Sequence, residues 1–250
     1  MNKMRYLHKT PEEQLIDLSL KEPTLLMMSP LAQIFQYIGI SLPKCWIGIR
    51  MPTDKLKEPL HSVRHCNDYK IPGDLDIIGG HLSDGIPSDY IVGIEIKRFR
   101  YLYSPDNRAW VVKNPDSYGR EQARGYSVFG FNKIMLCHFV VAEPIDHQDY
   151  NPWLLNASII ADGMQAVKKK RIKIKLCDPF GYCIIGWSQV SFKDPLYAGS
   201  FRGPEIIKST PENHFLADIN FKYVQKALLQ QVQRKLKELN SDSLPIILRF

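Results

Sequence analysis

The sequence lacks the features of a disulfide-stapled, zinc-binding or membrane-spanning protein. Its five cysteines are odd in number and form no C-x-x-C pair, so we expect reduced thiols rather than a disulfide framework or a zinc knuckle. No stretch reaches the roughly 18 apolar residues of a membrane span. The polar start MNKMRYLHKTPEEQ also lacks the apolar segment of a signal peptide. We therefore expect a cytoplasmic protein without a membrane partner.

Acidic residues are outnumbered by basic ones. The chain has 33 lysines and arginines against 26 aspartates and glutamates, a net charge of +7. This balance is typical of a surface that binds nucleic acid. The length of 250 residues and the hydrophobic content of 44% indicate a globular protein with one large domain, or a core with an appended subdomain.

Two apolar segments in the first half of the chain carry charged residues. GDLDIIGG places Asp74 and Asp76 beside apolar residues that predict a strand, and YIVGIEIK does the same for Glu95 and Lys97. Glu95 and Lys97 are two residues apart and therefore point to the same face of their strand. If the two strands pair, Asp76, Glu95 and Lys97 converge on one side of a sheet.

The chemistry of these residue types points to a metal site. Magnesium prefers hard oxygen ligands and is commonly held by one or two carboxylates plus substrate phosphate oxygens. Asp76 and Glu95 fit that role. A lysine beside the metal can orient or help to deprotonate the attacking water and can balance charge on a phosphate, and Lys97 fits that second role.

A helix is predicted after these strands, within SYGREQARGYSVFGF. Gln122 and Tyr126 are four residues apart and share one helix face, and Arg120 and Arg124 share another.

The segment resembles the PD-(D/E)XK nuclease superfamily, which has an acid at the start of one strand and (D/E)-x-K on the next. GDLD and EIK are similar to the strands of archaeal Holliday-junction resolvases, and Gln122-Ala-Arg-Gly-Tyr126 is similar to the Q-x-x-x-Y helix of RecB-type members. The resemblance covers about residues 45–142. It implies an α/β fold, a restriction-endonuclease-like core whose mixed central sheet is flanked by helices.

The resemblance also implies residue roles. Asp76 and Glu95 would bind Mg²⁺ or Mn²⁺, with Lys97 at the nucleophile and Gln122 supporting the bound water or the scissile phosphate. Asp74 would be an auxiliary acid, and Tyr126 would contact substrate or brace the site. Family members often add a glutamate from an early helix, for which Glu12 is the first candidate. Four arginines would contact DNA phosphates: Arg98, Arg100, Arg120 and Arg124.

Each pattern also has an ordinary structural interpretation. The two aspartates could be turn residues after Pro72-Gly73, the Glu95 and Lys97 pair an exposed cross-strand pair, and the Gln122 helix a plain amphipathic one. The order of the parts favours the nuclease interpretation.

The rest of the chain predicts further elements around this core. Helices are expected over residues 10–20, from Ser29-Pro30, and near residues 154–167, with strands at 44–51 and 133–142. A lysine-rich strand is expected at 168–176 and another strand at 181–190. Residues 101–117 would form a long loop over the site, in which Trp110 either stacks on a base or packs in the core, and a final amphipathic helix would end near residue 239.

These elements divide into N-terminal helices over 1–43, a nuclease-like core over 44–145 and an α+β extension over 146–250 packed on that core. We expect a Mg²⁺-dependent deoxyribonuclease. The alternatives are a nuclease-fold subunit without catalysis that binds nucleic acid and recruits partners, and a ribonuclease. The final helix could pack on the core, on a second copy as a homodimer, or on a partner protein.

Overall fold

The computed structural model describes residues 16, 29–61, 68–104, 109–113, 119–142, 157–169, 174–189, 199–213, 219–239 and 245–250. Their centre is one mixed β-sheet with eight strands among the described residues, in the order β7-β6-β5-β3-β2-β1-β8, with β4 pairing with β3. The strands are β1 (Cys45–Pro52), β2 (Asp74–Ser83), β3 (Ile86–Ser104), β4 (Ala109–Lys113), β5 (Lys133–Ala142), β6 (Gly181–Gln189), β7 (Gly199–Lys208) and β8 (Ile246–Arg249). The helices are α3 (Pro30–Tyr37), α4 (Lys57–His61), α5 (Arg120–Gly125), α6 (Ala157–Lys169) and α7 (Ile219–Leu239), with 3-10 turns at Leu42–Lys44, Asp54–Leu56 and Tyr126–Phe129.

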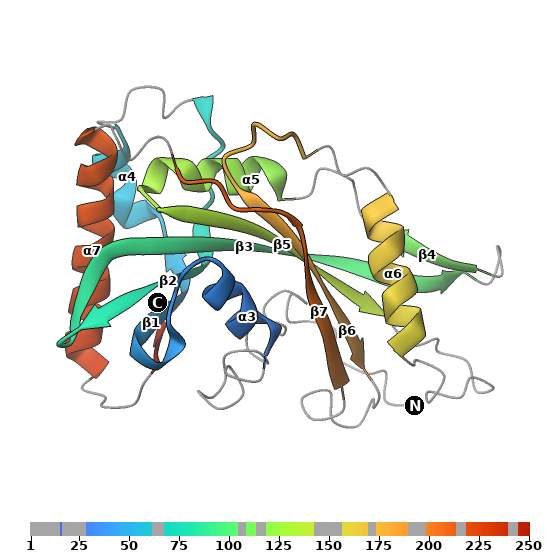
Figure 1. Cartoon of the computed structure of the whole chain (residues 1–250). Coiled ribbons are helices and arrows are strands. Elements are labelled where there is room, and N and C mark those ends of the chain that lie inside the picture. The colour runs from blue at the N-terminus through green and yellow to red at the C-terminus, as the bar shows by residue number, and fades with distance from the viewer. Residues whose placement is uncertain are drawn as a thin grey trace, which may run out of the picture.

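Helices cover both faces of this sheet (Figure 1). One face packs against α5, α6 and α7, in a cluster that includes Tyr126, Met164 and Leu228. The other packs against α3 through Leu31 and Phe35. The expected α/β fold with a mixed, helix-flanked sheet is therefore confirmed.

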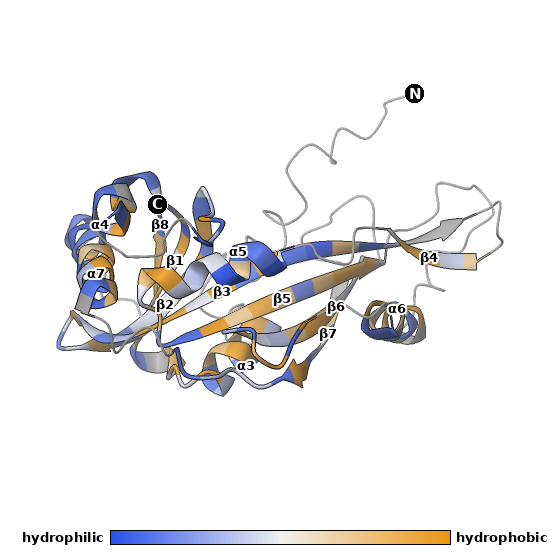
Figure 2. Ribbon diagram, turned by 90° about the horizontal axis from the view of Figure 1, so that it is seen from above, coloured by the Kyte–Doolittle hydropathy of each residue, from blue (hydrophilic) through white to orange (hydrophobic). Residues whose placement is uncertain are grey.

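The strands predicted around the charged residues form as expected. β1, β2 and β3 pair antiparallel in chain order, and β5 then lies parallel to β3. The apolar sequence KIMLCHFVVA becomes β5, which lies in the interior of the sheet and is mostly apolar (Figure 2). A strand that is covered on both faces has a continuous apolar sequence, because neither face meets water. For this reason β5 could be predicted from the sequence.

The predicted long loop over residues 101–117 is wrong. β3 continues to Ser104, and β4 returns antiparallel to it, with Tyr103 opposite Trp110. The Trp110 ring stacks on that of Tyr101, with ring centroids 5.2 Å apart. Trp110 therefore packs within a β-hairpin, as the core-packing alternative proposed.

One prediction in the C-terminal third is also wrong. Lys168 and Lys169, expected in a strand, form the last turn of α6, where cations interact favourably with the helix dipole. A strand that was not predicted, β7, forms over Gly199–Lys208 although it contains Gly203 and Pro204. β7 is an edge strand, because it pairs with β6 alone in the strand order. An edge strand tolerates proline, since the missing N–H can lie on the side that has no neighbouring strand.

The C-terminal helix α7 packs on the sheet. Its residues Val224, Leu228 and Val232 are fully buried in the cluster with Tyr126. Most of the apolar stripe that could have recruited a second chain is therefore used within this one.

The residues expected to form a C-terminal extension supply β6, β7 and β8 of the same sheet. The boundaries proposed at residues 44 and 145 stay a prediction. Ile16 is the one described residue of the helix predicted over 10–20, and it is helical and buried. Glu12, the candidate for an additional metal ligand, lies outside the described residues. None of the helices in the described ranges combines the length and the apolar character needed to cross a membrane.

Candidate active site

Three charged side chains meet where β2 and β3 face each other. Lys97 Nζ lies 2.8 Å from Glu95 Oε1 and 3.7 Å from Asp76 Oδ2. Glu95 and Lys97 are almost completely buried, whereas 15% of the Asp76 side chain is exposed. Asp76 therefore connects a buried charged pair to the solvent.

The strand pairing ends at this point. The last β2–β3 pair toward the site is Ile77 with Ile94, so the next backbone N–H groups of β3 need other partners. The carboxylate of Asp76 takes one of them, because its Oδ2 accepts the N–H of Ile96 at 2.8 Å. This hydrogen bond fixes the Asp76 carboxylate between the two strands.

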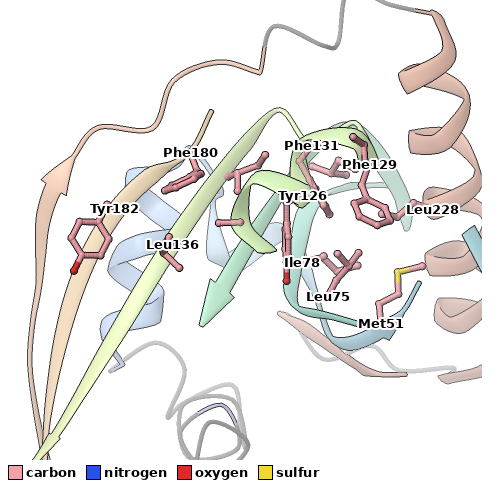
Figure 3. Packing of buried hydrophobic residues seen from close by; sticks show 14 of the residues in the cluster. Met51, Leu75, Ile78, Tyr126, Phe129, Phe131, Leu136, Phe180, Tyr182 and Leu228 are labelled. Carbon is pink, nitrogen blue, oxygen red and sulfur yellow. The ribbon is translucent and has the colours of Figure 1, made fainter. Parts of the chain in front are cut away.

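Tyr126, the residue after α5, forms hydrogen bonds with both acidic residues. Its hydroxyl oxygen accepts the backbone N–H of Asp76 at 2.7 Å, and its side chain is hydrogen-bonded to the Glu95 carboxylate. The ring enters the sheet face over Gly93, where a Cβ atom would lie 2.6 Å from Tyr126 Cδ1. Figure 3 shows the ring among the apolar residues of this face, beside Ile78. Tyr126 is fully buried, which favours the bracing role over the substrate contact among its two predicted roles.

Burial changes the titration of Glu95. Removal from water, followed by the negative charge of Asp76, raises the pKa of Glu95 from 4.5 to about 8, although Lys97 lowers it. Glu95 Oε1 is buried without a hydrogen bond of good geometry, even though Lys97 Nζ lies close to it. Lys97 and Tyr126 therefore offset only part of the cost of a negative charge on Glu95.

The residue that precedes α5 packs closely against the side chain of Lys97. Gly119, the N-cap residue, has a φ of +86°, and a Cβ atom there would lie 2.5 Å from Lys97 Cγ. A glycine allows both the left-handed backbone and the close approach. The lysine stem is thus held between β3 and the helix start.

The structure places Gln122 less centrally than predicted. α5 ends at Gly125 and Tyr126 begins a 3-10 turn, so the two residues do not share one regular helix. Gln122 is partly exposed, and the hydrogen bonds identified among the described residues do not join it to Asp76, Glu95 or Lys97.

The predicted phosphate-binding arginines lie in different places. Arg120 forms a two-pronged ion pair with Asp178, with both N–O distances at 3.0 Å. Arg124 is partly exposed and lies 3.4 Å from Glu121. Arg120 therefore has a structural partner within the protein, and the DNA-phosphate contacts of Arg120 and Arg124 stay predictions.

Arg98 and Arg100 point away from the charged side chains. Strand residues alternate between faces, and on β3 Phe99 packs on the α5 face whereas Ile96 packs on the α3 face. Arg98 and Arg100 therefore point to the same face of the sheet as Ile96. The alternation therefore places them on the opposite face from Glu95 and Lys97, and their contact with nucleic acid stays a prediction. Asp74 begins β2 and is exposed.

The two carboxylates have the hard oxygen donors that a divalent cation such as Mg²⁺ prefers. In the described part of the chain, no group of three or more His, Cys, Asp or Glu side chains is placed to hold a metal. Mg²⁺, however, is commonly bound through one or two carboxylates with water and substrate oxygens. Mutual repulsion and burial keep the pKa of Glu95 high, and a divalent cation between the acids would relieve both effects.

Comparisons of this chain with protein-family models, with curated proteins and with solved structures find no match.

Proposed function

We propose that the chain is a metal-dependent nuclease with a PD-(D/E)XK core that hydrolyses phosphodiester bonds in DNA. The observation that carries this proposal is the burial of Glu95 and Lys97 beside Asp76, where β2 and β3 part. Burying charged groups costs several kcal/mol, about as much as or more than their attraction returns. Perturbed titratable groups of this kind concentrate at functional sites.

Asp76 and Glu95 would hold the cation, Mg²⁺ or Mn²⁺, which would supply a water of lowered pKa and polarise a phosphate oxygen. Lys97 carries the positive charge that balances the negative charge gained by the phosphate. Its ammonium group lies 2.8 Å from Glu95 Oε1 and 3.7 Å from Asp76 Oδ2, close enough to both acids to orient a water beside them. Tyr126 and the Ile96 N–H keep the two carboxylates in place.

The surface around the acids supports an anionic polymer as substrate. Gln122 and Arg124 lie on the short helix α5, which follows Gly119, the residue packed closely against the Lys97 side chain. Both side chains are partly exposed, so they can reach phosphates on either side of the bond that is cut. The net charge of +7 favours the approach of DNA.

The decisive assay incubates the purified protein with supercoiled plasmid, linear duplex, single-stranded DNA and RNA. Each substrate is tested with Mg²⁺, with Mn²⁺ and with EDTA. We expect cleavage of DNA that requires the metal, and a loss of at least about a thousandfold in Asp76→Asn and Lys97→Met, because each removes a group that contacts the reacting phosphate or its water. Nicking of the closed plasmid would identify an endonuclease.

Asp89→Asn is the matched control. Asp89 is an exposed acid on β3, the strand that carries Glu95 and Lys97, and its substitution should leave the rate unchanged. Cleavage that survives both Asp76→Asn and Lys97→Met would refute the site. A folded wild-type protein that cuts none of the substrates would refute the proposed function, and cleavage of RNA alone would identify a ribonuclease.

A further inference from the structure

The solvent-facing side of α7 carries a row of lysines and glutamines without an acid. Residues three or four apart lie one above the other on a helix. At successive spacings of four, four, three and four residues, α7 has Lys222, Lys226, Gln230, Gln233 and Lys237. Gln233 is half-buried and the other four are exposed. These five residues, here called the basic stripe, extend over about 22 Å at the rise of an α-helix.

The basic stripe differs from an ordinary solvated helix face. Acids and bases four residues apart stabilise an exposed helix, whereas two lysines at that spacing, such as Lys222 and Lys226, repel each other. Among the described residues, the ion pair that involves α7 is Lys235 with Glu238, 3.3 Å apart. Asp89 lines a hollow together with Lys222 and Lys226, but no ion pair joins it to either lysine within the described ranges. The charges of the stripe are therefore available to an anionic partner.

The helix that carries the stripe is fixed to the elements of the candidate site. Its buried residue Leu228 packs in the cluster that contains Tyr126. The side chain of Gln225 donates from Nε2 to the carbonyl groups of Asp89 on β3 and of Gly130, at 2.9 and 2.8 Å. Figure 1 shows α7 at one end of the sheet and α6 at the other. A charged row of this length, held beside the site by a fixed helix, suits an extended polymer better than a small anion.

We propose that the basic stripe of α7 binds the phosphate backbone of duplex DNA and holds the substrate of the candidate site. Duplex DNA carries one negative charge per about 1.7 Å of its axis, so a row of about 22 Å meets several phosphates. Lysines bind phosphates as point charges, and the glutamine amides between them can donate to phosphate oxygens without reading the sequence.

A single strand is a poorer match to this surface. Proteins that hold single strands stack successive bases on several aromatic side chains, and α7 exposes one aromatic residue, Tyr223. A straight row of charges instead suits the regular backbone of a duplex. The inference rests on the proposed function, because it assigns where the same substrate is held.

The test measures the affinity for a fluorescein-labelled DNA duplex by anisotropy, in EDTA so that nothing is cleaved, over a series of salt concentrations. The stripe variant is Lys222→Gln/Lys226→Gln/Lys237→Gln, in which glutamine keeps a helix propensity close to that of lysine. We expect its affinity to be at least about thirtyfold weaker at about 0.1 M salt, and the slope of log K against log salt to fall by about 2–3. The urea midpoint should stay that of wild type. Arginine at the same three positions should restore the affinity to within about threefold, because the charges return.

Two further variants are matched controls. Lys235→Gln changes a lysine of the same helix that lies off the stripe and pairs with Glu238, and it should alter the affinity by less than about twofold. Lys168→Gln/Lys169→Gln/Arg202→Gln removes the same charge from exposed positions on α6 and β7, and it should weaken binding by less than about threefold. A loss equal to that of the stripe variant would mean that DNA responds to net charge alone, and it would overturn the inference.

The outcomes separate this inference from the proposed function. If the protein cuts DNA but the stripe variant binds the duplex as tightly as wild type, the nuclease stands and the inference fails. A wild-type protein that binds no duplex in EDTA also overturns the inference. If the protein binds the duplex through the stripe but cuts no nucleic acid, the contact is supported and the nuclease is refuted. A loss of affinity confined to a single-stranded probe of the same length would overturn the assignment to a duplex.

Discussion

Two buried charged clusters flank the start of α5, and they are built in opposite ways. In the first, Asp178 accepts from Arg120 Nε and Nη2 at 3.0 Å each and from the Lys175 N–H at 2.7 Å. Burial alone would raise the pKa of Asp178, but these hydrogen bonds and the charge of Arg120 hold it below its ordinary value. In the second cluster, burial and Asp76 raise the pKa of Glu95 to about 8.

The difference separates a structural ion pair from a candidate site. A lowered carboxylate pKa means that the fold stabilises the charge, so the Arg120–Asp178 pair joins α5 to the turn before β6 at a net gain. A raised pKa means that the fold disfavours the charge, which a bound cation would compensate. In the first cluster, residues of the protein compensate the charge of Asp178. The second cluster is suited to a bound cation.

The largest expected effect is a gain in stability from Glu95→Gln. Unfolded Glu95 loses its proton near pH 4.5, whereas the folded residue keeps it to about pH 8, so the folded state binds more protons in this window and wild-type stability falls as pH rises through it. A glutamine does not titrate. In EDTA we expect no difference from wild type near pH 4.5 and a gain of about 5 kcal/mol above pH 8, measured by urea unfolding across this range. A variant that is less stable than wild type at pH 9 would contradict the account.

Asp178→Asn should have the opposite sign and lower stability by about 2–3 kcal/mol, because it leaves the largely buried Arg120 charge without its partner. The stabilising contribution of Asp178 is present above the unfolded pKa of 3.8 and is lost as pH falls through the lower folded value. Urea unfolding at pH 7 measures the loss, and its disappearance in strong acid checks the cause.

The control for Asp178→Asn is Glu121→Gln. It breaks the exposed Arg124–Glu121 pair and should change stability by less than about 0.5 kcal/mol. Equal effects of the two substitutions would mean that the Arg120–Asp178 pair is no more than a surface contact.

Gly119→Ala and Gly85→Ala compare two glycines of positive φ, +86° and +75°. A new Cβ at Gly119 meets Lys97, whereas one at Gly85 meets open space. Both should lose about 1 kcal/mol for the left-handed backbone, and Gly119→Ala about 1 kcal/mol more for the clash. Cleavage should fall about tenfold only in Gly119→Ala, since a displaced Lys97 no longer meets the water. Equal cleavage by the two variants would show that the helix start does not position the lysine.

Tyr126→Phe should cost about 1–2 kcal/mol, because the Asp76 N–H and Glu95 lose a buried partner. The hydrogen bond from Tyr126 lowers the pKa of Glu95, so its loss should move the pH–rate profile of cleavage to higher pH. Tyr90→Phe removes a hydroxyl that donates to the Ile38 carbonyl at 2.8 Å and should leave the profile in place. A profile unmoved by Tyr126→Phe would reduce Tyr126 to a packing residue.

The sequence predicted the elements whose signals are local. Alternating apolar residues defined β2 and β3, and the spacing of Glu95 and Lys97 fixed their common face. β7 and the β3–β4 hairpin were missed because glycine and proline in an edge strand look like a loop, and because a long strand can carry polar residues once it leaves the core.

The partners of the charged residues depend on distant parts of the chain. Arg120 and Asp178 are separated by 58 residues, and no pattern of local spacing reports such a contact. The left-handed backbone of Arg50 also has no signature in the sequence, because arginine is not a residue that favours positive φ. The face of Arg98 and Arg100, by contrast, could have been predicted from their phase relative to Glu95.

The central claim is that Asp76 and Glu95 form an incomplete pair suited to a divalent cation. Titration of the wild-type protein with Mn²⁺ at pH 7, by calorimetry in two buffers of different ionisation enthalpy, tests it most directly. We predict one ion per chain with release of close to one proton, because Glu95 must lose its proton to become a ligand, and weaker binding without proton release in Glu95→Gln. Identical Mn²⁺ binding by the two proteins, or none by the wild type at millimolar Mn²⁺, would contradict the claim.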